Sequence, residues 1–221
     1  MASSAARMPA PPPPPLPAIG FAATGLACRR GERLVFAGLS FLLAPGEALL
    51  LTGPNGSGKS SLLRLMAGLA RPEAGLLAWD GAAVGDDPAA HRARLHFIGH
   101  QEAVKPVLTV AETLAFWAGM RGGGDVAAAL GRFRLETLAD WPCRMLSAGQ
   151  RRRLALARLA ASPAPLWLLD EPTTALDSDA LADLLEAIAA HRAQGGRVAL
   201  STHAALPLAG ATNLSLADFT P

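Results

Sequence analysis

Lysine, tyrosine and cysteine are scarce in this chain of 221 residues. Lysine occurs twice, at Lys59 and Lys105, among twenty basic residues, and tyrosine is absent. This bias accompanies abundant Ala, Gly and Pro and reflects genome composition, so a lysine kept within a motif is informative. The two cysteines, Cys28 and Cys143, form neither a CxxC pair nor a metal-ligand pattern. We therefore expect reduced thiols in a reducing compartment, with a structural disulfide as the alternative.

Long apolar runs that would span a membrane are also lacking. Residues 8–28 carry no charge, but seven of these 21 residues are proline, which would break a spanning helix. Residues 198–217 lack charged side chains yet contain seven Ser, Thr, His, Pro and Asn residues. The amino terminus has no compact apolar region of the kind found in secretory signals. We expect a cytosolic protein, either free or docked on a membrane protein.

The charge balance argues against a protein that coats nucleic acid. The formal net charge is +2, and the 51% of hydrophobic residues suffice for one buried core. Arg151–Arg153 form a basic run, which we interpret as the solvated face of a helix rather than a nucleic-acid site. Residues 1–17, rich in Ala, Ser and Pro, are predicted to be a disordered or polyproline II tail, and Met8 is an alternative start. The folded domain is then 18–221.

The order of apolar runs and amphipathic segments indicates an α/β domain. Strands are predicted at residues 39–43, 48–52, 76–79, 95–98, 166–169, 197–202 and 213–216. Helices are predicted at residues 59–67, 109–119, 125–133, 149–161 and 178–192. Asp80-Gly81 is a strong turn pair, and Thr109 with Glu112 forms a capping box. The helix-rich stretch at about 103–148 is predicted to be an inserted lobe.

A phosphate-binding loop lies between a predicted strand and a predicted helix, which is the context that supports the motif. The segment that matches G-x-x-x-x-G-K-[ST] comprises Gly53, Pro54, Asn55, Gly56, Ser57, Gly58, Lys59 and Ser60, and Ser61 follows it. Glycines allow backbone N–H groups to surround a phosphate, and the start of the helix adds its positive dipole end. Lys59 would neutralise the β- and γ-phosphates of ATP, and the Ser60 hydroxyl can ligate Mg²⁺.

Two carboxylates follow the very apolar strand at residues 166–169. Asp170 and Glu171 would lie at the carboxyl end of that strand, where parallel α/β sheets place their ligands. We expect Asp170 to hold Mg²⁺ through a water molecule and Glu171 to orient or deprotonate the attacking water. Alone this pattern is common, but together with the phosphate loop it predicts a nucleotide hydrolase.

Leu146–Gln150 read LSAGQ, which closely resembles the LSGGQ signature of the ABC ATPase family. Ser147 lies 23 residues before Asp170, and Ala148 replaces a glycine, a small-for-small change. A helix start at this point can bind phosphate. The resemblance implies that Ser147, Gly149 and Gln150 bind the γ-phosphate held by the phosphate loop of a second copy, so that ATP joins a head-to-tail homodimer.

Other elements of the family occur in the family's order. The resemblance assigns Gln101 to the Q-loop glutamine of the catalytic and metal sites, Ala175–Asp177 to the D-loop, and His203 to the histidine that contacts the γ-phosphate. The family's nucleotide-stacking aromatic, aligned back from Ser40, falls on Arg30. A guanidinium plane can stack on adenine, and a solvated loop arginine is the alternative.

Within the family, several segments resemble the ATP-binding subunit of cytochrome c maturation systems, the haem exporter ATPase. These segments are 26–29, 99–101, 112–117, 146–159 and 167–177. The resemblance implies an α/β P-loop NTPase core with a RecA-like mixed sheet, an antiparallel β subdomain and an inserted helical subdomain. It implies ATP and Mg²⁺ as cofactors, integral-membrane permease partners, no nucleic acid, and a peripheral place on the cytoplasmic face of the inner membrane. No CxxCH occurs and the five histidines form no ligand pattern, so haem would be handled through the partners.

Three other functions are compatible with parts of this pattern. The chain could serve an ABC exporter of another substrate, or act as an ATP-dependent regulatory switch on a membrane complex. It could also be an ABC ATPase of translation or DNA repair, but families of that kind usually carry two such domains or a long coiled-coil insertion, and neither occurs here.

Overall fold

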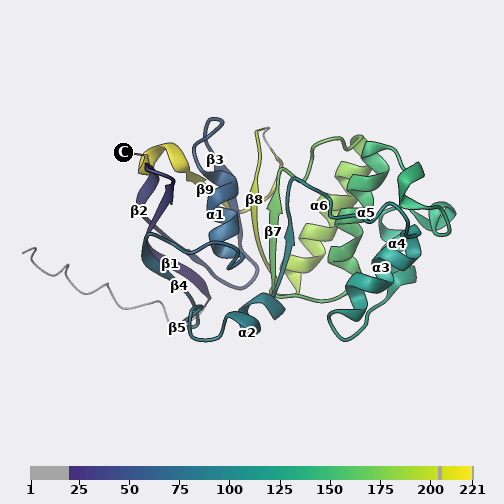
Figure 1. Ribbon diagram of the computed structural model, residues 1–221, viewed down its shortest axis with the longest axis horizontal. Helices are drawn as coiled ribbons and strands as arrows, with labels where there is room; N and C mark the ends of the chain where they lie inside the picture. Colours follow the sequence, from purple (N-terminus) through teal and green to yellow (C-terminus); the bar gives the residue numbers. More distant parts are fainter. Residues whose placement is uncertain (1–19, 204–205, 221) are drawn as a thin grey trace, which may run out of the picture.

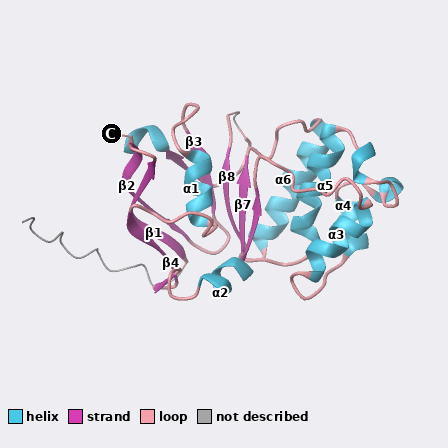
Figure 2. Cartoon of the chain, viewed as in Figure 1, coloured by secondary structure: helices cyan, strands magenta, loops and turns pink. Residues whose placement is uncertain are grey.

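The computed structural model describes residues 20–203 and 206–220 and arranges them in two sheets and a group of helices. The antiparallel sheet lies at one end of the molecule, the parallel sheet lies in the middle, and helices α3 to α5 lie at the other end (Figure 1, Figure 2). The predicted tail at residues 1–17, and Met8 with it, lies outside the described residues. Among the described residues, no helix is long and apolar enough to cross a membrane.

The antiparallel sheet has the strand order β2-β1-β4-β5. Its strands are β1 (Phe21–Arg30), β2 (Arg33–Leu43), β4 (Ala74–Trp79) and β5 (Ala82–Ala83). The sequence patterns did not predict β1 or the first half of β2, because Ala and Gly, which have weak strand preference, interrupt the apolar pattern there. The predicted turn is confirmed: Asp80 and Gly81 have φ of 48° and 85° and join Trp79 to its cross-strand partner Ala82.

The parallel sheet has the strand order β6-β7-β8-β3-β9. Its strands are β3 (Ala48–Thr52), β6 (Leu95–Ile98), β7 (Leu166–Asp170), β8 (Arg197–Ser201) and β9 (Ala211–Ser215). All residues of β7 and β8 are buried, as expected for strands covered on both faces. All four pairings are parallel, so the strands share one carboxyl edge. This edge carries the residues that follow β3, β7 and β8.

Helices cover the parallel sheet on both sides (Figure 1). Helix α1 (Lys59–Met66) lies between the two sheets, where Leu62 and Leu63 share a core cluster with Phe21 and Leu168. Helices α5 (Ala148–Ala161) and α6 (Ser178–Ala193) cover the other face. The short helix α2 (Pro88–Ala93) was not predicted, although Asp87 caps it. Its six residues are too few to show a helical period.

The stretch predicted as an inserted lobe contains short helices. They are α3 (Val110–Gly119), α4 (Val126–Arg132) and the 3₁₀ turns η1 (Glu136–Leu138) and η2 (Cys143–Met145). Helices α3 and α4 pack on α5, and the predicted capping box of Thr109 and Glu112 is present. The final turn η3 (Leu216–Phe219) packs on β2 and β3. The boundaries of a separate lobe at about 103–148 stay a prediction.

Candidate functional site

The predicted phosphate loop connects β3 to α1, and its glycines are required by the geometry. Gly58 caps α1 with φ of 104°, and a Cβ atom there would approach Val35 Cγ1 to 2.7 Å. Gly53 has φ of 133°, and a Cβ atom there would lie 2.9 Å from Ser57 Oγ. Larger residues would therefore strain the backbone and collide with their neighbours. Glycine at these two positions therefore allows the backbone of the loop to curl around the start of α1.

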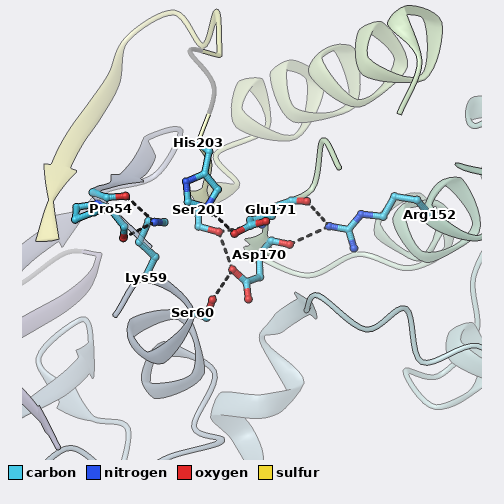
Figure 3. A network of polar contacts seen from close by, with 9 residues as sticks. Pro54, Lys59, Ser60, Arg152, Asp170, Glu171, Ser201 and His203 are labelled. Atoms are coloured by element: carbon cyan, nitrogen blue, oxygen red, sulfur yellow. Dashed lines mark hydrogen bonds and ion pairs between the residues drawn. The ribbon is translucent and has the colours of Figure 1, made fainter. Parts of the chain in front are cut away.

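Lys59 is a buried cation held by carbonyl groups of the same loop. It is only 5% exposed, and its Nζ donates to Gly53 O at 2.7 Å and to Pro54 O at 3.2 Å (Figure 3). Among the described residues, no carboxylate forms an ion pair with Lys59, and the buried Ser57 Oγ has no hydrogen-bond partner. A buried cation beside an unsatisfied hydroxyl suits a bound anion. The loop therefore fits the phosphates of ATP.

Oxygen atoms suited to Mg²⁺ meet at the carboxyl end of β7. Ser60 Oγ donates to Asp170 Oδ1 at 3.0 Å, which joins the start of α1 to β7. Within the described part of the chain, no cluster of three His, Cys, Asp or Glu residues could hold a metal ion alone. Mg²⁺ usually takes one or two protein oxygens and completes its shell with phosphate oxygens and water. The hydroxyl and carboxylate present here fit that requirement.

Glu171 is held in an unusual backbone conformation next to His203. Its φ is 48°, a left-handed value that is uncommon outside glycine. Its N–H donates to Ser201 Oγ at 2.9 Å, and its Oε1 lies 2.8 Å from His203 Nε2 (Figure 3). Strained backbone of this kind persists where neighbouring contacts fix it, and such positions cluster at active sites. The Glu171 carboxylate is thereby kept at the mouth of the phosphate loop.

These side chains surround one cavity of about 150 Å³. Its lining residues are Arg30, Val35, Asn55, Gly56, Gly58, Lys59, Ser60, Ser61, Glu171 and His203. The structure thus brings together most of the predicted catalytic and phosphate-binding residues. Arg30, at the end of β1, is exposed and lines this cavity, as is required of a residue that stacks on the adenine ring of ATP. Its stacking role stays a prediction.

The signature residues and Gln101 lie outside this cavity. Ser147 caps α5: its Oγ accepts from Gln150 N at 3.2 Å, and Gln150 Oε1 accepts from Ser147 N at 2.8 Å. A Cβ atom on Gly149 would lie 2.9 Å from Ala175 O, whereas Ala148 is exposed, so the structure has room for a methyl group at position 148 but not at 149. Gln101 is exposed and bonds to neither Ser60 nor Asp170 among the described residues. Its metal role stays a prediction.

The interpretation of Arg151–Arg153 as a solvated face was wrong for Arg152. This residue is 3% exposed, and its guanidinium donates to carbonyl groups at the ends of β6 and β7. Its spacing from the buried residues Ala155, Leu156 and Leu159 places it on the apolar face of α5. That helical spacing was the signal available in the sequence. Ser201, which contacts both Asp170 and Glu171, was also missed.

A larger hollow of about 650 Å³ lies at the opposite end of the parallel strands. Its lining includes Trp167, near the start of β7, and His191, whose ring stacks on the indole at 3.9 Å. Burial lowers the pKa of His191 to about 4, so the imidazole is neutral at pH 7. The lining holds no carboxylate, and it comes mainly from α5, α6 and the loops that precede β7 and β8. The smaller cavity at the carboxyl edge is lined instead by predicted catalytic and phosphate-binding residues.

Comparison with known proteins agrees with this geometry. Residues 36–174 match the ABC transporter family. The chain is 61% identical over 207 residues to the cytochrome c biogenesis ATP-binding export protein CcmA of Rhodospirillum rubrum, covering 93% of this chain and 88% of that protein. It is 59% identical over 205 residues to CcmA of Paramagnetospirillum magneticum, covering 90% and 94% respectively.

Solved structures share the fold. One is the ATP-binding subunit of an ABC transporter, with 27% identity and a TM-score of 0.75 over 83% of this chain and 79% of that chain. Another is a dimeric ATP-binding cassette in a post-hydrolysis state with ADP and Pi, with 25% identity and a TM-score of 0.74 over 83% and 88%. These likenesses confirm the predicted ABC ATPase fold. The chain belongs to the ABC transporter family of ATP-hydrolysing subunits, and within it to the cytochrome c biogenesis ATP-binding export proteins.

Proposed function

We propose that this chain is the ATP-hydrolysing motor of a membrane export complex in c-type cytochrome biogenesis. The observation that carries this proposal is the cavity in which Lys59, Ser60, Glu171 and His203 converge, in a chain that is 61% identical to a protein named for this process. Haem is the cargo inferred from the family resemblance. The resemblance further implies that this chain acts on haem only through its partners.

Each residue of the cavity has a task that its contacts support. Lys59 would release its loop carbonyls and neutralise the β- and γ-phosphates of ATP. Ser60 and Asp170 would hold Mg²⁺, which supplies positive charge where negative charge develops. Glu171 would orient the attacking water and accept its proton, and His203 would hold the Glu171 carboxylate and contact the γ-phosphate. Gln101 would complete the metal site once the protein has closed on the nucleotide.

A second copy of the chain would complete the site. Ser147, Gly149 and Gln150 lie at the start of α5, outside the cavity of their own copy. The helix start is exposed at Ser147 and offers N–H groups to a phosphate. The related cassette with ADP and Pi is dimeric. We infer a head-to-tail homodimer in which each α5 start contacts the γ-phosphate bound by the other copy.

The site would transmit its motion to integral-membrane permease subunits on the cytoplasmic face of the inner membrane. The resemblance to ABC ATP-binding subunits supports such partners, since those subunits work with separate membrane proteins. Nothing in the cavity favours nucleic acid, because its basic residues, Arg30 and Lys59, line a small cavity rather than an extended groove.

The dimer is tested with Glu171→Gln, which keeps the shape of the side chain but removes the base. We expect ATP turnover to fall by roughly 10²- to 10³-fold while ATP binding persists. The variant should then elute as a dimer with ATP and as a monomer after Ser147→Arg is added. Full turnover by Glu171→Gln, or an ATP-bound monomer, would show that the assigned base or the assigned dimer is wrong.

The transport role is tested by affinity purification of the tagged chain from membranes of its source cells. We expect cytochrome c assembly proteins to co-purify, and we expect Lys59→Ala to abolish formation of c-type cytochromes. If Lys59→Ala supports normal cytochrome formation, the chain is a binding switch rather than a motor. If other permeases co-purify instead, the cargo is not haem.

A further inference from the structure

Arg152 joins three segments of the site through backbone carbonyls. Its Nη1 donates to Gly99 O at 3.0 Å, and its Nη2 donates to Asp170 O at 2.9 Å and to Glu171 O at 2.7 Å. Its Nε donates to Pro172 O at 3.2 Å. Figure 3 shows the guanidinium reaching from α5 to the end of β7. One side chain thus fixes the ends of β6 and β7 to α5.

The burial of this charge needs an explanation. Burial lowers the pKa of Arg152, and the carboxylates of Glu102, Asp170 and Glu171 act in the opposite direction. Yet none of the described carboxylates forms a salt bridge with Arg152. A buried charge without a counter-ion is costly unless its donors are satisfied. Here carbonyl groups in a fixed arrangement satisfy them, and a planar five-donor guanidinium suits that task better than an amine.

One of the carbonyls belongs to the residue with the strained backbone. Glu171 has φ of 48°, and its carbonyl group accepts from Arg152 while its N–H donates to Ser201 Oγ. Outside turns, a non-glycine residue in this region is strained and persists when surrounding contacts fix it, as these two hydrogen bonds do on either side of Glu171. Arg152 therefore controls the backbone from which the catalytic carboxylate projects.

The same helix carries the signature at its start. Ser147 caps α5, and Arg152 follows five residues later, about 7.5 Å along the helix axis. The capping box of Ser147 and Gln150 makes the start of α5 rigid, and a Cβ atom on Gly149 would touch Ala175 O. Movement of the start of α5 relative to β7 would therefore stretch the hydrogen bonds of Arg152.

We propose that Arg152 is a positioning residue that couples the two ATP sites of the dimer. It holds the α5 start, which contacts the nucleotide of the other copy, in a fixed relation to the Glu171 backbone of its own copy. Contact of Ser147 with the other copy's nucleotide then places the Glu171 carboxylate where it can orient the attacking water in its own site. This inference rests on the proposed ATPase dimer.

The first experiment measures ATP turnover and ATP binding of the full chain with Arg152→Met and Arg152→Lys. Met keeps an unbranched apolar stem without the guanidinium donors, whereas Lys retains the charge but cannot span all four carbonyls. We expect kcat to fall roughly 10- to 100-fold for Met and less for Lys, as for a misplaced catalytic group, with the Kd for ATP nearly unchanged. Arg153→Met is the matched control, because the Arg153 side chain bonds to none of the described residues.

The second experiment tests whether Arg152 also affects the start of α5, by measuring dimer formation. In the Glu171→Gln background, the ATP concentration needed for dimer formation reports on the α5 start. We expect added Arg152→Met to raise this concentration roughly 10-fold, as an altered contact geometry would, and added Arg153→Met to leave it unchanged. If Arg152 only positioned Glu171, dimer formation would be unaffected. A change in dimer formation therefore distinguishes coupling of the two sites from an effect on Glu171 alone.

The outcomes distinguish the coupling from the proposed function. Normal turnover by Arg152→Met, or a fall in kcat with normal dimer formation, would show that the coupling is wrong. So would failure of both Arg152 variants to fold, since the residue would then serve stability alone. Failure of the unmodified chain to hydrolyse ATP would instead overturn the proposed function, and the coupling with it.

Discussion

The Ser201 hydroxyl donates a hydrogen bond of 2.7 Å to Asp170 Oδ1 from the facing position on the neighbouring strand. Ser201 Oγ in turn accepts a hydrogen bond of 2.9 Å from Glu171 N. Ser201 is completely buried, so water cannot replace either bond. One hydroxyl therefore orients the expected metal-binding carboxylate and fixes the peptide of the expected base.

Replacing Ser201 by alanine should reduce both stability and turnover. The change removes two hydrogen bonds and leaves the Glu171 N–H unsatisfied, which costs about 1–3 kcal/mol. Urea unfolding of Ser201→Ala measures this loss, and ATP turnover should fall along with it. Ser215→Ala is the matched control, because the Ser215 hydroxyl caps no helix. Equal stability of the two variants would contradict the bridging role.

Lys59 should be required for nucleotide binding, and Lys105 should not. With MgATP at 100 times its Kd, binding adds about 2.7 kcal/mol, which raises the Tm by roughly 5–10 °C for a domain of this size. Lys59→Ala should lose this shift, because the phosphates then lack their buried cation. Thermal melting with and without MgATP measures it. Lys105→Ala, whose amine lies over the Phe116 ring, should keep the full shift.

Removal of Mg²⁺ should separate binding from hydrolysis. Ser60 and Asp170 supply the oxygens that fit the ion, whereas the phosphate loop binds ATP through its own cation and N–H groups. With EDTA present, we expect turnover to stop while a reduced Tm shift from ATP remains. A melting assay and a phosphate-release assay on the same sample check this. Turnover that persists in EDTA would exclude the assigned metal role.

His203 should affect turnover more than ATP binding. Its Nε2 lies 2.8 Å from Glu171 Oε1, so the ring holds the carboxylate in place. His203→Ala should lower kcat by roughly 10- to 100-fold, and the Kd for ATP should change little. His203→Gln retains a donor and should recover part of the loss. A variant whose Kd rises in step with its fall in kcat would instead indicate a general binding role.

Buried His96 should make the fold less stable in acid. Burial lowers its pKa to about 4, and the positive charges of Arg121 and Arg158 act in the same direction. The unfolded chain, with a pKa near the ordinary 6.5, takes up the proton first, so stability present above pH 6.5 is lost as the pH falls toward 4. This loss amounts to roughly 2 kcal/mol between pH 7.5 and 5.

Urea unfolding of the unmodified chain and of His96→Gln at both pH values measures this effect. The variant should show a smaller pH dependence, because glutamine takes up no proton. His191, whose pKa is also lowered to about 4 by burial, contributes in the same direction and remains in both proteins. An unchanged pH dependence in His96→Gln would exclude His96 as the cause.

The amino-acid sequence by itself determined which chemistry is possible. Gly53, Gly58 and Lys59 predict a phosphate loop. Such a loop needs glycines that adopt positive φ and allow close approach, and a lysine beside them, and all of these lie within one short segment. Asp170 and Glu171 follow a short apolar run typical of a buried strand, and their position at the sheet edge follows from parallel pairing. These features depend on neighbours along the chain, so local patterns reveal them.

The tertiary structure alone decided how the carboxylate of Glu171, the expected base, is held. The partners of Arg152 lie as many as 53 residues away, and Ser201 meets Asp170 across 31 residues. No local pattern contains such contacts: the helical spacing places Arg152 on the apolar face of α5 but does not show which groups its guanidinium meets, and a serine in a strand is unremarkable. Packing of α5 against the ends of β6 and β7 supplied the backbone carbonyls that satisfy its buried donors.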